Sequence, residues 1–257
     1  MLYFYVLLLD LLKRLFSYLF CFLVLSSNAQ TKKRNFRQSE VGIFAGASYY
    51  LGDLNPRGHF LFSKPAVGVF YRFTNHYRYA FRFGFNYGTV TGNDAKSKEL
   101  DQRERNLNFR SRIYDLHAIA EFNFVDYRIG NDKHRFTMFI FAGIGGFMFD
   151  PQSNRGQGYQ SLDNIHVNIP PQKYSKVQIN VPYGIGFKWN IGDIFGIGIE
   201  WSPRKLFTDY LDDVSGEYAD GNMRGNPRTK DWYFFYGATL TIRLPKANRP
   251  CHGLGFE

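Results

Sequence analysis

Apolar side chains recur at every second position along most of this chain from residue 41 onward. The clearest case is residues 77–87, in which six aromatic side chains alternate with arginine, alanine, glycine and asparagine. A period of two predicts β-strands, because successive side chains of a strand point to opposite faces of the sheet. An aromatic face opposite a face with arginines fits a lipid-facing exterior and a polar interior better than it fits a soluble sheet.

The same alternation predicts further strands. It recurs at residues 67–73, 114–124, 176–189, 195–202 and 232–244. Two more stretches, 40–51 and 136–149, are strand-like but apolar on both faces, so the pattern does not assign their outward side. The total is eight strands, an even number, which is typical of bacterial outer-membrane barrels.

The predicted connections between these strands alternate between long and short. They are residues 52–64, 74–76, 91–108, 125–135, 150–173, 190–193 and 208–230. Outer-membrane barrels have long extracellular loops and short periplasmic turns, and an even strand count places both termini in the periplasm. The sequence therefore predicts an all-β fold, an eight-stranded antiparallel transmembrane β-barrel in the outer membrane, with both termini periplasmic.

The inward faces of the predicted strands carry charges, which must be paired or hydrated inside a closed barrel. The expected interior network consists of Arg72, Arg78, Arg82, Asp115, His117, Glu121, Lys176, Lys188, Glu200 and Arg243. Six cations face three anions in this set, and the excess predicts trapped water or acidic loop residues that fold inward. A barrel of eight strands is filled by its own side chains, so a conducting pore is not expected.

Composition agrees with short amphipathic strands. The chain has 257 residues, of which 19% are aromatic and 25 are glycine, and its mean hydropathy is −0.33. These values disfavour disorder, a coiled coil and a helical membrane bundle. The formal net charge is +10, but nucleic acid is not an expected partner of an exported chain.

The N-terminal region carries the only long apolar run, residues 15–25, which follows a basic pair and precedes small residues. This order predicts a signal peptide at residues 1–29, followed by the barrel domain with its periplasmic ends at residues 30–257. An uncleaved N-terminal anchor is the alternative, although the run is shorter than the ~20 residues that a spanning helix needs.

Candidate catalytic and metal-binding residues are few. His117 shares a predicted strand face with Asp115 and Glu121, and a histidine beside a carboxylate is the minimal part of a general base. No serine can be placed beside it, so an internal polar network is favoured, and neither an enzyme nor a cofactor is expected. A carboxylate cluster in the last long loop could bind Ca²⁺, but a solvated loop is favoured because the spacing matches no known calcium loop. The cluster consists of Asp209, Asp212, Asp213, Glu217 and Asp220.

Four segments together resemble one known family. They are residues 41–56, 106–116, 207–215 and 231–237, which read VGIFAGASYYLGDLNP, NLNFRSRIYDL, FTDYLDDVS and DWYFFYG. They are similar to the outer-membrane barrel family of Bacteroidota that includes PorG of the type IX secretion system. The resemblance implies a non-enzymatic barrel in outer-membrane lipid, and PorG members associate with a periplasmic ring of a lipoprotein and a partner subunit.

This resemblance suggests a role for the basic termini. Both ends would lie in the periplasm, where a basic surface could dock an acidic ring component and the one cysteine left after signal removal could crosslink to it. The expected partner-binding residues are Lys32, Lys33, Arg34, Arg37 and Cys251. Two alternatives stay open: a stand-alone barrel that binds a ligand or host surface through its extracellular loops, and, less favoured, a lipid-modifying outer-membrane enzyme.

Overall fold

The computed structural model describes the strands and the shorter connections of this chain. The described residues are 37–52, 55, 58–93, 108–131, 133–154, 159–161, 175–208, 211 and 231–245. All of them belong to one unit, Phe36–Glu257. The expected signal peptide, the first three basic residues after it, the acidic cluster and Cys251 lie outside the described residues. The described residues contain no helix that is long and apolar enough to cross a membrane.

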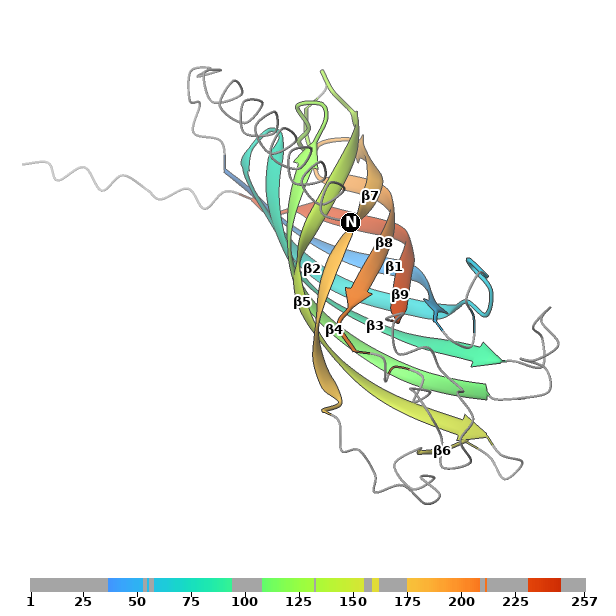
Figure 1. The fold of residues 1–257 in the computed structure, drawn as a ribbon. Helices are drawn as coiled ribbons and strands as arrows, with labels where there is room; N and C mark the ends of the chain where they lie inside the picture. The colour runs from blue at the N-terminus through green and yellow to red at the C-terminus, as the bar shows by residue number, and fades with distance from the viewer. Residues whose placement is uncertain are drawn as a thin grey trace, which may run out of the picture. The chain divides into compact units, whose positions relative to one another are not determined.

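Eight long strands form one closed antiparallel barrel (Figure 1). They are β1 (Gln38–Leu51), β2 (Lys64–His76), β3 (Tyr79–Asn93), β4 (Asn108–Asn123), β5 (Phe136–Asn154), β7 (Val177–Ile191), β8 (Phe195–Leu206) and β9 (Trp232–Arg243). Each strand pairs with its neighbours along the chain, and β1 also pairs with β9, which closes the cylinder. In the described part of the chain, the short β6 (Tyr159–Ser161) pairs only with the end of β5. The predicted eight-stranded antiparallel barrel is confirmed.

The two ends of the barrel differ in their connections. At one end, which we call the turn end, residues 77–78, 124–135 and 192–194 join consecutive strands, and β1 begins and β9 ends there. The connections at the other end, the loop end, are residues 52–63, 94–107, 155–176 and 207–231. Gly192 has a φ of 69°, a left-handed conformation that favours glycine in a hairpin turn.

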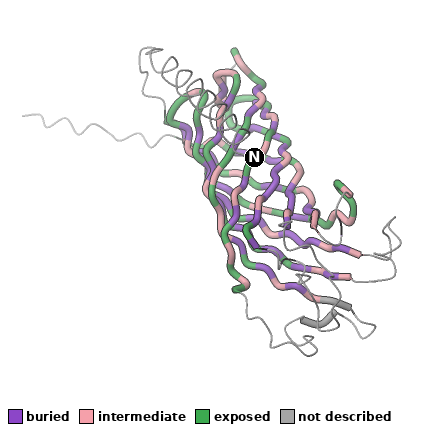
Figure 2. The backbone as a smooth tube through the Cα atoms, in the orientation of Figure 1, coloured by how far each residue is buried: buried purple, intermediate pink, exposed green. Residues whose placement is uncertain are grey.

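The outer face of the barrel carries an apolar band. Exposed and buried residues alternate along the strands, as the green and purple segments of Figure 2 show. The two stretches that the sequence pattern left open are now assigned: Ile43 and Ile144 point outward with 54% and 73% of their surface exposed, whereas Phe44 is buried inside. In β1 the strand register decides which side chains face outward, because Ile43 lies opposite the outward-facing Val69 of β2 and Leu240 of β9.

Aromatic side chains form a girdle near each end of this band. The girdle at the turn end contains Tyr71, Tyr79, Phe124, Phe136, Trp189 and Phe195, and the girdle at the loop end contains Tyr49, Tyr87, Tyr114, Tyr183, Trp201, Trp232 and Tyr236. Valine, isoleucine, leucine and phenylalanine side chains are exposed between them. This arrangement matches a hydrocarbon core with an interface on each side, so the barrel spans a membrane.

The β4–β5 connection, residues 124–135, crosses the barrel mouth at the turn end. Its Tyr127 N–H donates to the Tyr77 carbonyl at 3.2 Å on one side, and its Gly130 N–H donates to Asn190 Oδ1 at 3.2 Å on the other. Tyr127 and Ile129 point inward and are buried. Burial, together with the charge of a nearby glutamate, raises the pKa of the Tyr127 phenol, so this group stays neutral beneath the mouth. The turn end is therefore capped.

The loop end of the interior is filled by a separate apolar core. Its members come from most of the strands and include Phe44, Tyr50, Phe109, Ile113, Phe147, Phe149, Tyr233 and Phe235. Several rings meet edge to face, for example Tyr50 and Phe109 with centroids 4.9 Å apart. Charged and polar side chains occupy the space between this core and the cap at the turn end.

Candidate functional site

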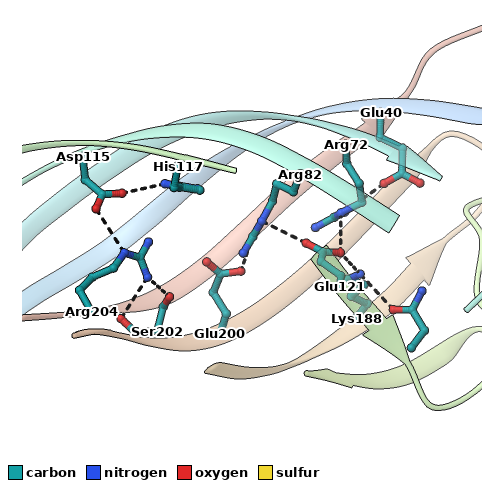
Figure 3. Close-up of polar contacts among 11 residues, drawn as sticks. Glu40, Arg72, Arg82, Asp115, His117, Glu121, Lys188, Glu200, Ser202 and Arg204 are labelled. Carbon is teal, nitrogen blue, oxygen red and sulfur yellow. Dashed lines mark hydrogen bonds and ion pairs between the residues drawn. The ribbon is translucent and has the colours of Figure 1, made fainter. Parts of the chain in front are cut away.

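The centre of the barrel interior is organised around one carboxylate, Glu121 of β4 (Figure 3). Three cations from three other strands surround it: Arg72 Nε at 2.9 Å, Arg82 Nε at 3.0 Å and Lys188 Nζ at 2.5 Å. Lys188 also donates to Asn123 Oδ1 at 3.1 Å. The two Nε contacts act mainly through charge, because neither meets the angles of a hydrogen bond. One anion therefore ties β2, β3, β4 and β7 together.

Each arginine of this group binds a second carboxylate. Arg72 Nη1 donates to Glu40 Oε2 at 3.0 Å, and Arg82 Nη1 donates to Glu200 Oε2 at 2.6 Å. We call these six side chains the Glu121 cluster: Glu40, Arg72, Arg82, Glu121, Lys188 and Glu200. It contains three cations and three anions, all of them buried, and is therefore neutral.

Aromatic rings cover the cations of the Glu121 cluster. The Arg72 and Arg82 guanidinium carbons lie 4.9 and 5.4 Å from the centre of the Phe70 ring. Lys188 Nζ lies 4.1 Å from the centre of the Phe139 ring. These cation–π contacts gain strength when the cation is removed from water. They replace part of the hydration that the buried charges have lost.

A second cluster, which we call the Asp115 cluster, lies closer to the loop end. Asp115 Oδ2 accepts hydrogen bonds from the Tyr233 hydroxyl at 2.6 Å, Asn180 Nδ2 at 2.9 Å and Arg204 Nε at 3.3 Å. Its other oxygen lies 2.7 Å from His117 Nδ1. A buried carboxylate needs such partners to remain ionised. This cluster joins β4, β7, β8 and β9.

The contact between His117 and Asp115 is the arrangement that general-base catalysis uses, so its surroundings decide its role. Both side chains are buried, and Asp115 is already held by three further donors. The other ring nitrogen faces Gly84 of β3, where an added Cβ would approach it to 2.6 Å. Among the described residues, no serine hydroxyl is hydrogen bonded to this ring. The His117 ring is therefore a buried member of the Asp115 cluster, packed against β3.

Metal binding finds no support in the described part of the barrel. There, no group of three or more His, Cys, Asp or Glu side chains is arranged to hold a metal ion. The acidic cluster of the last long loop lies outside the described residues.

Three residues of the expected interior network lie at the barrel ends instead. Arg78 is in the β2–β3 turn, where it pairs with Asp126 at 2.8 Å, and both side chains are 49% exposed. Lys176 pairs with Asp150 at 3.0 Å near the loop end, where both are partly exposed. Arg243 ends β9 and donates to a backbone carbonyl of the cap. The interior placement of Arg78 and Lys176 is wrong, because alternation continues past the point where the barrel wall ends, whereas Arg243 follows the buried Thr239 and Thr241 on the inward face and lies at the capped mouth.

Two charged residues of the interior were missed by the sequence pattern. Glu40 begins a stretch whose two faces both look apolar, so its side was not assigned. Arg204 follows Pro203 beyond the predicted end of its strand, and one more step of the alternation would have placed it inside. With these changes the strands hold four buried cations, Arg72, Arg82, Lys188 and Arg204, and four buried anions, Glu40, Asp115, Glu121 and Glu200. The expected excess of interior cations is therefore wrong.

The expected partner-binding residues lie mostly beyond the described chain. Arg37 is exposed directly before β1 at the turn end. Lys32, Lys33, Arg34 and Cys251 lie outside the described residues.

Comparison with known proteins adds a family and a set of similar folds. The family described as Domain of unknown function (DUF6089) matches residues 13–254. A search among curated proteins returns no match. The solved structures that are similar include the attachment invasion locus protein Ail of Yersinia pestis, with 12% identity over 81% of this chain and 99% of Ail, at a TM-score of 0.45. Neisserial surface protein A has 9% identity over 80% of this chain and 97% of its own, at 0.43. The outer-membrane enzyme PagL has 12% identity over 80% and 99%, at 0.32. These likenesses concern the fold alone.

Proposed function

This chain belongs to the DUF6089 family, and we propose that it is a non-enzymatic outer-membrane barrel that serves as a structural or accessory component of the type IX secretion system. In this proposal both termini lie in the periplasm, and the turn end docks subunits of a periplasmic lipoprotein ring. The likeness of residues 41–56 and 231–237 to the barrel family that includes PorG supports the assignment.

The observation that carries a structural role is the filled interior, in which each of the two charge clusters holds as many cations as anions. The apolar core, the Asp115 cluster, the Glu121 cluster and the cap follow one another along the barrel axis. Opening a path through the described part of the barrel would separate buried charges from their partners, at a cost of several kcal/mol per ion. The barrel therefore acts through its surfaces rather than as a conduit.

The turn end presents a basic surface to a periplasmic partner. Among the described residues at this end, outside the buried clusters, six side chains are basic and two are acidic, a formal charge of +4. They are Arg37, Arg78, Arg128, Lys133, Arg135 and Arg243, with Asp126 and Asp193. The cap holds three of the six on a connection whose Tyr127 and Ile129 side chains are buried in the mouth. Such a surface complements an acidic protein face and speeds its encounter.

The direct test is recovery of partners with the full chain. We expect an affinity pull-down from outer membranes, read by mass spectrometry, to recover periplasmic ring lipoproteins of the secretion system, and deletion of the chain to abolish cargo secretion. The proposal would be refuted if the pull-down recovered no ring lipoprotein and the deletion strain secreted its cargo normally. Recovery of loop-side ligands alone would favour the stand-alone surface-binding barrel, and a changed lipid A mass on deletion would favour a lipid-modifying enzyme.

Charge reversal at the turn end separates docking from folding. We expect Arg37→Glu with Lys133→Glu to weaken ring recovery roughly tenfold, which corresponds to about 1.4 kcal/mol. The matched control is Lys64→Glu with Arg112→Glu, two exposed basic residues near the loop end, which should leave recovery unchanged. Crosslinks from Cys251 should map to the same partner. Equal losses in both double variants would contradict docking at the turn end.

A further inference from the structure

The barrel wall has a notch at the loop end that the β1–β2 connection fills. β1 pairs with β9 as far as Leu51, and β3 pairs with β4 as far as Asn93. β2, which lies between them, begins only at Lys64, opposite Ser48. The last residues of β1 and β3 therefore have no β2 neighbour. Residues 58–63 lie in this place: Thr91 of β3 donates to the Phe62 carbonyl at 3.3 Å.

The same segment folds onto the outer face of the barrel. Tyr49 and Phe234 occupy outward-facing positions of β1 and β9, yet both are buried, with their rings stacked 4.5 Å apart. Phe60 covers Tyr49 and its neighbour Tyr236, with ring centres 5.0 Å apart in each pair, and the His59 ring lies 5.8 Å from that of Phe234. The Tyr236 hydroxyl donates to Ser63 Oγ at 3.1 Å, which fixes the end of the segment.

Two phenylalanines of the segment have an unfavourable backbone. Phe60 and Phe62 have φ values of 63° and 57°, and within the described chain they are the only non-glycine residues with positive φ. Bulky residues rarely adopt this conformation, and it persists where surrounding contacts enforce it. Here it turns the tip outward, so that Phe60 and the following Leu61 are each 53% exposed.

We propose that residues 58–63 form a lipid-inserted brace, whose Phe60–Leu61 tip enters the membrane leaflet at the loop end and contacts its acyl chains. The tip is continuous with the lipid-facing band, because Phe60 lies on aromatic residues of the loop-end girdle whose strands run directly into that band. Tyrosine, tryptophan and histidine side chains surround it with their polar atoms hydrogen bonded, as in Trp201 Nε1 to the Tyr49 hydroxyl at 3.0 Å. Such amphipathic rings prefer the membrane interface.

The brace fixes the depth at which the barrel sits. Elsewhere the barrel contacts lipid through the outward-facing side chains of its strands. The tip instead projects from a connection that is hydrogen bonded to β3, β1 and β9. Because the tip inserts at one point of the loop-end girdle, it resists movement of the barrel along the membrane normal and tilt of the barrel toward that side. This role is independent of any secretion partner, since it requires only lipid.

Site-specific quenching in vesicles tests the brace. The full chain with Cys21→Ser and Cys251→Ser receives one fluorophore at Leu61→Cys, in phosphatidylcholine vesicles without brominated lipids or with lipids brominated in the upper and in the middle part of the acyl chain. An Ile144→Cys label in the middle of the band and a label at the exposed Ser175→Cys, two residues before β7, give the lipid and water references. We expect the Leu61 label to lose fluorescence as the Ile144 label does. If the Leu61 label loses no more fluorescence than the Ser175 label, the proposal is overturned. The exposed tip would then be open to a protein partner instead of lipid.

A pair of unlabelled variants, compared by their stability, tests the same proposal if the fluorophore disturbs folding. Leu61→Asp places a charge in the leaflet, whereas Ser175→Asp places the same charge in water at the same end of the barrel. We expect only Leu61→Asp to lower the urea midpoint of unfolding in vesicles, with heat-modifiable gel migration as the measure of the folded fraction. Equal midpoints for the two variants would refute lipid insertion.

Discussion

Replacing Glu121 by glutamine tests whether the interior charges hold the barrel together. The substitution preserves the shape of the side chain and removes the anion that Arg72, Arg82 and Lys188 share. Each of the two arginines keeps its second carboxylate, so each loses only part of its charge compensation. Among its contacts in the described chain, Lys188 keeps the amide oxygen of Asn123 and the Phe139 ring, neither of which carries a negative charge, so most of the cost falls on this cation.

The expected cost follows from the burial of Lys188. Removing one partner of a buried ion pair destabilises a protein by about 3–5 kcal/mol, because a buried charge is left uncompensated. With a urea dependence of about 1–3 kcal/mol per molar, the unfolding midpoint should fall by roughly 1 M or more. The matched control is Asp126→Asn, the same chemical change in an exposed pair, which should cost about 0–1 kcal/mol.

The assay is urea unfolding of the full chain in phospholipid vesicles, followed by heat-modifiable migration and tryptophan fluorescence. The double variant Glu121→Gln with Lys188→Met restores equal numbers of cations and anions in the cluster. We expect it to be more stable than the sum of the two single losses by about 1–3 kcal/mol. If Glu121→Gln shifts the midpoint no more than Asp126→Asn does, or if the double variant is merely additive, the reasoning is refuted.

Two further predictions concern packing. Gly46→Ala should destabilise the barrel by about 1–3 kcal/mol, because its Cβ would lie 2.6 Å from the Gly237 Cα, whereas Gly146→Ala, with nothing nearer than 3.8 Å, should be tolerated in the same urea assay. Ile129→Ala in the cap should cost about 2–5 kcal/mol yet open no steady conductance in a planar bilayer, since the two charge clusters still fill the interior; a stable channel would contradict the filled-interior model of function.

The sequence by itself was informative wherever a property repeats every two residues. The faces of residues 79–87 and 177–189 could be read directly, because side-chain direction in a strand is set by the local backbone. Strand number and the position of the short turn at Gly192 followed from the same pattern. The pattern failed at residues 40–51, where both faces are apolar, and beyond Pro203, where the strand continues past its predicted end.

What only the tertiary structure decided is which side chains meet. Glu121 is 67 residues from Lys188, and Asp115 is 118 residues from Tyr233. Barrel closure and strand register bring them within hydrogen-bonding distance. No local pattern carries this information, since it depends on how every strand between them is paired. The balance of four cations and four anions buried in the strands is likewise a property of the closed barrel. A buried charge without a partner is too costly to keep, so pairing across the barrel sets which charges can stay inside.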